Sequence, residues 1–123
     1  MIPYGKQDVN DDDIKAVVSV LKSDFLTQGP KVSEFEKDLS TYCGSRFVKV
    51  VNSATAALHL SYLAVGLKKD DIVWTTPNTF VATANAALFC GASVDFVDID
   101  PKTYNLSIES LKVKLVKAKK EGN

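Results

Sequence analysis

The chain has 123 residues, of which 46% are hydrophobic and 24% are charged. This composition is typical of a soluble globular protein with one core, and the 15 basic and 15 acidic residues cancel, so no net field attracts nucleic acid or an anionic membrane. No signal peptide and no apolar run of membrane-spanning length is present, and the two cysteines, Cys43 and Cys90, have no metal-binding or disulfide spacing. We therefore expect a cytoplasmic protein.

Residues 1–46 predict a helical segment. Asn10 and the aspartates that follow it are typical of a helix start, and apolar residues then recur at helical intervals, at Ile14, Val17, Val18 and Leu21. A loop over 24–30 separates this helix from a second one, whose apolar positions are Val32, Phe35, Leu39 and Tyr42. Gly44 is expected to end the second helix.

Residues 47–123 predict alternating strands and helices. The expected strands are 47–51, 72–76 and 93–99, and the expected helices are 54–66, 79–91 and 107–119. Helical crossovers between apolar strands generate a parallel sheet, so the fold class is α/β with three parallel strands. Ligands of such sheets bind beyond the carboxyl ends of the strands. Because the pattern stops after a helix, where another strand is expected, the chain has the appearance of a fragment.

A small, hydroxyl-bearing turn joins the first predicted strand to its helix. Ser53, Ala54 and Thr55 fall at the start of that helix, where free backbone N–H groups and the helix dipole favour an anion. The small Ala54 side chain would allow a phosphate to approach the backbone. The alternative is that the hydroxyls are ordinary N-caps with no ligand.

An aromatic residue, Phe80, follows the second predicted strand. A flat ring could stack on it, close to the anion site of the previous turn, and the combination describes a site for a phosphorylated heteroaromatic such as pyridoxal phosphate. The alternative is that Phe80 packs its helix onto the sheet.

Three further acidic or basic candidates have simpler explanations. His59 is the single histidine and has no second ligand in spacing. Asp98 and Asp100 could face a divalent cation or act as a paired acid and base at a strand end, but without a third ligand they are better explained by a solvated strand end and a turn before Pro101. No Gly-x-Gly-x-x-Gly follows the first strand, which excludes a dinucleotide-binding dehydrogenase. A non-catalytic α/β module that binds a phosphate or nucleotide remains an alternative function.

The motifs resemble, in order and spacing, those of the DegT/DnrJ/EryC1/StrS sugar aminotransferases. The resemblance runs from about Ile2 to the last residue and rests on residues 26–30, 52–58, 79–86, 91–92 and 96–100. Within the family the chain is similar to the pseudaminic acid branch, through residues 73–77 and 114–122. The transaminases of that branch act on C4 of a UDP-linked 4-keto-6-deoxy-N-acetylhexosamine.

This resemblance implies a homodimeric fold-type I enzyme that moves an amino group from glutamate to a keto-sugar by means of pyridoxal phosphate. The chain would be the N-terminal portion of its large domain. Ala54 and Thr55 would hold the cofactor phosphate, with Ser53 in support, and Phe80 would stack on the pyridine ring. The residues implied for the nucleotide-sugar pocket are Tyr4, Asp24, Phe25, Leu26, Thr27 and again Ala54.

The same resemblance implies that essential groups are missing from this chain. The Schiff-base lysine and the aspartate that pairs with the pyridinium nitrogen belong to motifs that no segment here resembles, and transamination needs both. No residue of the chain is therefore assigned as catalytic, and we expect it to be inactive alone, as about a third of an aminotransferase.

Overall fold

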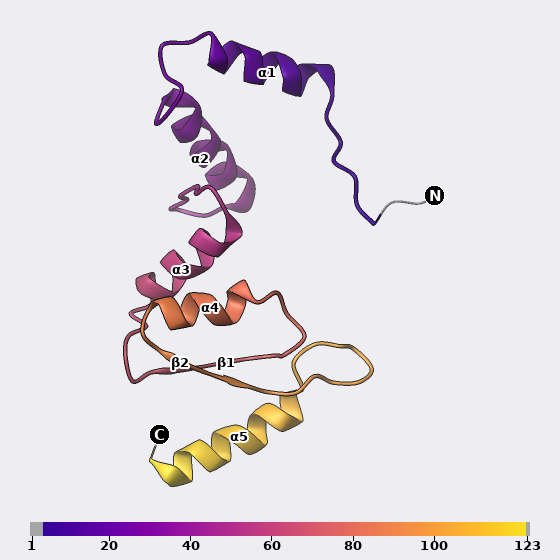
Figure 1. Ribbon diagram of the computed structural model, residues 1–123, viewed down its shortest axis with the longest axis vertical. Helices are drawn as coiled ribbons and strands as arrows, with labels where there is room; N and C mark the ends of the chain where they lie inside the picture. The colour runs from indigo at the N-terminus through magenta and orange to yellow at the C-terminus, as the bar shows by residue number, and fades with distance from the viewer. Residues whose placement is uncertain (1–3, 123) are drawn as a thin grey trace. The chain divides into compact units, whose positions relative to one another are not determined.

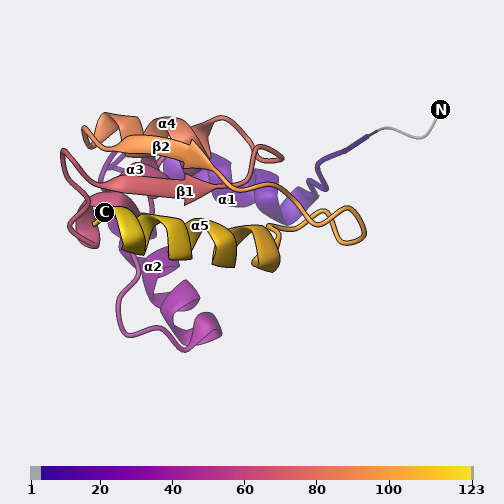
Figure 2. The same cartoon turned by 90° about the horizontal axis from the view of Figure 1, so that it is seen from below.

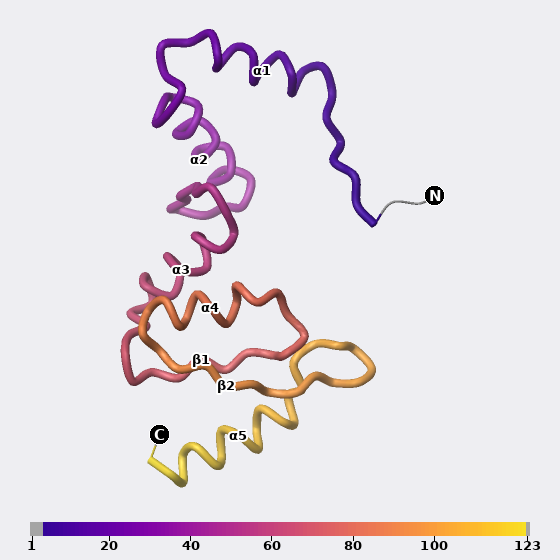
Figure 3. The backbone as a smooth tube through the Cα atoms, viewed as in Figure 1, coloured from indigo at the N-terminus to yellow at the C-terminus, as the bar shows by residue number. Residues whose placement is uncertain are grey.

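The computed structural model describes residues 4–122 and divides the chain into two units, Met1–Val50 and Val51–Asn123. Ile2, where the family resemblance begins, and Asn123, where it ends, lie outside the described residues. The backbone trace can be followed from end to end in Figure 3. Among the helices that are described, none has both the length and the apolar character needed to cross a membrane.

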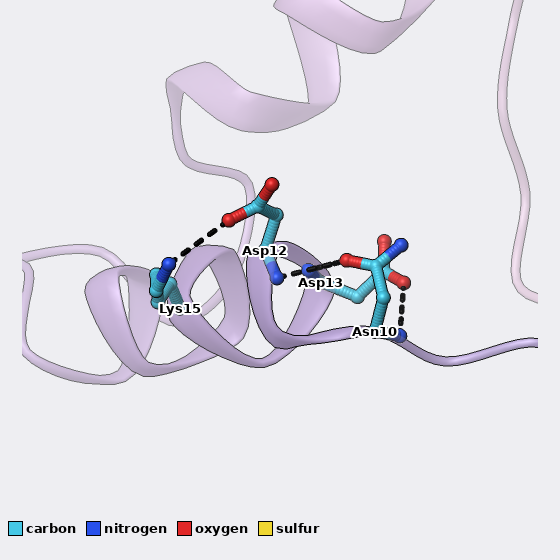
Figure 4. Close-up of polar contacts among 4 residues, drawn as sticks. All are labelled: Asn10, Asp12, Asp13 and Lys15. Atoms are coloured by element: carbon cyan, nitrogen blue, oxygen red, sulfur yellow. Dashed lines mark hydrogen bonds and ion pairs between the residues drawn. The ribbon is translucent and has the colours of Figure 1, made fainter.

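Helix α1 (Asp11–Leu21) begins as the sequence predicts, at Asn10. The Asn10 side chain accepts hydrogen bonds from the backbone N–H groups of Asp12 (2.8 Å) and Asp13 (3.2 Å), and the Asp13 carboxylate accepts one from the Asn10 N–H (2.9 Å). Figure 4 shows this reciprocal cap. Because it satisfies N–H groups that the helix cannot, the start of α1 is determined by neighbouring residues alone.

Helix α2 (Pro30–Cys43) has Pro30 in its first turn and ends at Gly44, as expected. Gly44 has φ of +63°, a left-handed conformation that glycine adopts without strain, and its N–H donates to the Ser40 carbonyl. After the turn the chain runs back along α2, where the Glu36 carboxylate accepts from Lys49 Nζ (2.8 Å) and from the Val50 N–H (3.2 Å). These bonds lower the pKa of Glu36, the Lys49 ammonium having the largest effect.

The strand predicted for residues 47–51 is not formed, so that prediction was wrong. The β-branched composition of the segment favours a strand only where a neighbouring strand supplies the ladder of hydrogen bonds. Within residues 4–122 no strand pairs with it, and Glu36 takes the Val50 N–H instead. The sheet consequently has two strands in place of the three expected.

The second unit confirms the α/β fold class. Its elements are α3 (Ala54–Ala64), β1 (Ile72–Thr75), α4 (Ala82–Phe89), β2 (Ser93–Phe96) and α5 (Ile108–Glu121). Strands β1 and β2 pair in parallel, with Ile72 opposite Ser93 and Thr75 opposite Phe96, and α4 is the crossover between them. Most boundaries lie within two residues of prediction, and the largest differences are that the helix expected from 79 begins at Ala82 and the strand expected to reach 99 ends at Phe96.

The helices cover both faces of this small sheet. Figures 1 and 2 show α4 on one face, with α3 beside it, and α5 on the other. Ala82, Ala86 and Ala87 of α4 are buried, and their small side chains allow the helix to lie close against the strands. Val97 and Thr75 are buried at the carboxyl ends of the strands, where the Val97 N–H donates to the Thr75 carbonyl (2.8 Å).

Helix α5 is joined to the sheet through Lys114. Its ammonium forms an ion pair with Asp95, donates to the Phe96 carbonyl (2.7 Å) and lies 5.4 Å from the centre of the Trp74 ring. The hydrogen bond from Lys114 is the main reason that the pKa of Asp95 lies below its usual range. Each of the two strands thus contributes a contact to the Lys114 ammonium, on the face of the sheet that α5 covers.

Candidate functional site

The start of α3 exposes backbone donors. Ser53 is the N-cap in extended conformation, and its Oγ accepts a hydrogen bond from the Ala56 N–H (3.2 Å), so this residue does cap the helix. The Ala57 N–H donates to the Ser53 carbonyl. In the described chain, no acceptor is assigned to the N–H groups of Ala54 and Thr55, the next two residues. The cap therefore leaves two donors at the positive end of the helix dipole.

Capping does not use up the Ser53 hydroxyl. A hydroxyl has one donor and two acceptor positions, and the cap occupies an acceptor position only. The Ser53 Oγ also lies 3.5 Å from Asn52 Oδ1, a long contact at the limit of hydrogen bonding. Ser53 can cap α3 and donate to an anion at the same time.

Phe80 lies in the turn between β1 and α4. The Asn78 N–H donates to Thr76 Oγ1 (3.1 Å) at the start of this turn, and the helix begins two residues after Phe80. The Phe80 side chain is 75% exposed, so it does not serve to pack α4 onto the sheet, which was the alternative explanation. An uncovered aromatic face at the carboxyl end of a parallel strand is a suitable platform for a flat ligand.

Three hydrogen bonds around Thr83 connect this turn with α3. The Thr83 N–H donates to the Phe80 carbonyl (3.0 Å), and the Thr83 and Thr79 hydroxyls lie 3.0 Å apart. From α3, the Tyr62 hydroxyl donates to the Thr83 carbonyl (3.2 Å). Sequence reasoning did not find this network, because a tyrosine at helical spacing indicates only a packed side chain and the partner is 21 residues away.

The loop after β2 lies beside the same turn. The Asn78 amide donates to the Tyr104 carbonyl at 3.5 Å, and Tyr104 adopts a left-handed φ of +59°. Asp100 accepts hydrogen bonds from the N–H groups of Thr103 (2.9 Å) and Lys102 (2.8 Å), which hold its pKa below the usual range. The turn explanation for Asp100 is confirmed.

No metal centre is formed by the residues between 4 and 122, since no group of three potential ligands comes together there. His59 packs against Phe89 instead, with ring centroids 5.6 Å apart and an interplanar angle of 68°. This edge-to-face contact joins α3 to α4.

Of the residues predicted to bind substrate, Ala54 lies in the second unit and all the others lie in the first. Tyr4 is exposed before α1, and residues 24–27 form the loop between α1 and α2. Phe25 and Leu26 line a cavity of about 140 Å³ there, and a Cβ on Gly29 would come within 2.8 Å of the Phe25 Cβ, so this loop conformation requires glycine. The residues predicted to bind cofactor, 53–55 and Phe80, all belong to the second unit.

Known proteins resemble the chain along most of its length. One relative is the UDP-4-amino-4,6-dideoxy-N-acetyl-beta-L-altrosamine transaminase of Campylobacter jejuni. It is 50% identical over 117 residues, which is 95% of this chain and 31% of that protein. The spore coat polysaccharide biosynthesis protein SpsC of Bacillus subtilis is 40% identical over 105 residues, 85% of this chain and 27% of SpsC. The matched region thus spans less than a third of the length of these relatives.

Solved structures agree with the sequence relatives. A putative sugar aminotransferase from Streptococcus pneumoniae, in its PLP form, matches with a TM-score of 0.86 at 32% identity, over 91% of this chain and 29% of that one. A sugar aminotransferase from Micromonospora echinospora matches with a TM-score of 0.80 at 37% identity, over 93% and 31%. The profile of the DegT/DnrJ/EryC1/StrS aminotransferase family matches residues 7–121. The chain therefore belongs to the DegT/DnrJ/EryC1/StrS aminotransferase family.

Proposed function

We propose that this chain supplies the phosphate-binding and ring-stacking part of the cofactor site of a pyridoxal-phosphate-dependent sugar aminotransferase. The observation that carries the proposal is the pair of N–H groups at the start of α3 that have no acceptor among residues 4–122, in the same unit as the exposed ring of Phe80. Donors for a phosphate and a platform for an aromatic ring are the two features that a phosphorylated pyridine requires.

In this proposal the cofactor phosphate is held at the start of α3. The N–H groups of Ala54 and Thr55 donate to its oxygens, and the hydroxyls of Thr55 and Ser53 add two further bonds. A larger side chain at Ala54 would keep the phosphate away from the backbone. The exposed position of Ala54 and the half-buried position of Thr55 are compatible with this geometry.

Phe80 would lie against one face of the pyridine ring and exclude water from it. When bound, pyridoxal phosphate supplies an electron sink for cleavage of the bond between the amino-bearing carbon and its hydrogen. The lysine and the ring-pairing aspartate needed for that chemistry are proposed to lie elsewhere in the complete gene product, the protein translated from the whole coding sequence. We expect this chain by itself to be inactive.

The proposed substrates are glutamate and a UDP-linked 4-keto-6-deoxy-N-acetylhexosamine. The proposal is supported by the names of two Campylobacter jejuni transaminases, which are 50% and 46% identical to this chain. Tyr4, the loop of Asp24, Phe25, Leu26 and Thr27, and Ala54 are the residues proposed to contact the nucleotide sugar. The cavity beside Phe25 is lined by apolar side chains together with polar ones, among them Ser23 and Lys31, a mixture that suits a polar ligand with an apolar face.

The proposed setting is a cytoplasmic homodimer in which the chain forms the N-terminal portion of the cofactor-binding large domain. Residues 1–46 would be its helical segment and residues 47–123 its β/α part. Exposed apolar side chains on α1, among them Ile14, Val17 and Leu21, support the proposal that another part of the complete protein, or its partner subunit, packs against this helix.

The test follows the nitrogen atom. The complete gene product is incubated with pyridoxal phosphate, the keto-sugar nucleotide and glutamate labelled with ¹⁵N at its amino group. We expect the label at C4 of the sugar and an equal amount of 2-oxoglutarate, with neither product when glutamate is omitted. A gene product that binds the cofactor but never transfers label, with this or related keto-sugars, would refute the proposed reaction.

A further inference from the structure

We propose that Thr83 is a positioning residue, which holds the ring of Phe80 at a set distance from the start of α3. The inference rests on the proposed function, in which one small cofactor contacts both places. Thr83 itself does not touch the cofactor. Its three hydrogen bonds connect the turn that carries Phe80 with the helix that carries the phosphate donors.

Packing alone does not hold Phe80 in place. With 75% of its side chain exposed, the ring is positioned by its own backbone, and that backbone is fixed on both sides by Thr83. The Thr83 N–H donates to the carbonyl of Phe80 itself (3.0 Å). The Thr83 hydroxyl forms a hydrogen bond with the hydroxyl of Thr79, the residue before Phe80 (3.0 Å). The turn lies before the first residue of α4, and the helix ladder reaches only its last residue, Val81, whose carbonyl accepts from the Asn85 N–H (3.0 Å).

The third bond fixes the turn relative to α3. The Tyr62 hydroxyl donates to the Thr83 carbonyl (3.2 Å), in a partly buried position where a lost hydrogen bond is costly. Tyr62 and the phosphate donors, Ala54 and Thr55, belong to the same helix. The phosphate and the pyridine ring of one cofactor are joined by a short linker that limits their separation, so the site needs a matching separation between α3 and Phe80.

The test measures the affinity of the complete gene product for pyridoxal phosphate and the induced circular dichroism of the bound cofactor. Thr83→Val keeps the shape of the side chain and removes only its hydroxyl. We expect it to raise Kd about fivefold, the equivalent of one hydrogen bond, and to weaken the dichroism. Thr83→Ser should restore both. Tyr62→Phe should act in the same direction as Thr83→Val.

Matched controls separate positioning from stability. Thr41→Val removes a threonine hydroxyl that bonds to the Lys37 carbonyl within α2, and Ser61→Ala removes a hydroxyl that bonds to the Ala57 carbonyl within α3. Neither variant should change Kd or the dichroism. An equal change in Thr41→Val would mean that any lost helix hydroxyl weakens binding, and would overturn the inference.

The decisive variant combines Thr83→Val with Phe80→Ala. If Thr83 acts through Phe80, the threonine substitution should have no further effect once the ring is absent. A full fivefold effect in that background would overturn the inference and leave the proposed role of Phe80 intact. If Phe80→Ala alone leaves Kd unchanged, the stacking role in the proposed function is wrong, which is a separate result.

Discussion

Replacing Ser53 with alanine tests whether this residue only caps α3 or also binds the cofactor. The variant loses the hydrogen bond from the Ala56 N–H (3.2 Å), and loss of an N-cap costs about 1 kcal/mol. The protection of the Ala56 amide against hydrogen exchange should therefore fall about fivefold. If the hydroxyl also donates to the cofactor phosphate, a charge-assisted bond worth about 1.5–3 kcal/mol is lost, and Kd for pyridoxal phosphate should rise about 10- to 100-fold.

Ser107 provides the control. It caps α5 through the same contact, its Oγ accepting from the Ser110 N–H at 3.2 Å, and it has no place in the proposed site. Ser107→Ala should lower the protection of the Ser110 amide about fivefold and leave the cofactor Kd unchanged. If Ser53→Ala binds the cofactor as well as Ser107→Ala does, Ser53 is a cap only, and its assignment as a cofactor ligand is wrong.

Three other substitutions test the site and the fold. Phe80→Ala should raise Kd for pyridoxal phosphate about 5- to 10-fold by loss of ring stacking. Phe47→Ala removes an equally exposed ring and should leave Kd unchanged. Equal effects of the two substitutions in a binding titration would contradict the assignment of Phe80 to the cofactor site. Gly44→Ala should lower the free energy of unfolding, measured by urea denaturation, by about 1 kcal/mol, because a residue with a side chain is strained at the Gly44 φ of +63°. An unchanged midpoint of the urea transition would refute this. Because the pKa of Glu36 is lowered on folding, its bonds to Lys49 and Val50 stabilise the protein above about pH 4 and are lost as the carboxylate is protonated below that. Glu36→Gln should therefore flatten the fall in stability on acidification, and an unaltered acid profile would count against the ion pair.

Features determined by neighbouring residues could be predicted from the sequence. The start of α1 at Asn10 and the end of α2 at Gly44 depend on contacts within four residues, and both predictions are confirmed. The α/β alternation after residue 51 follows from hydrophobic periodicity, which is also local. For the same reason the Ser53 cap could be recognised before the structure was known.

Features that depend on distant partners could not be predicted. Residues 47–51 have the composition of a strand, but a strand forms only beside another one, and within residues 4–122 none pairs with them. The late start of α4 at Ala82 is instead a local feature, a contact between the Thr79 and Thr83 hydroxyls four residues apart, which hydrophobic periodicity alone does not reveal. The bond between Tyr62 and Thr83 spans 21 residues and has no signature in the sequence. The residues of the proposed site could thus be named in advance, whereas the contacts that position them could not.

Native mass spectrometry of the complete gene product with pyridoxal phosphate tests the central claim most directly, because it counts cofactor molecules on each chain. We predict one bound cofactor per chain in the wild-type protein, and reduced occupancy in Thr55→Val and Phe80→Ala at the same cofactor concentration. No binding to the wild type, or full occupancy in both variants, would contradict the claim that α3 and Phe80 form the cofactor site.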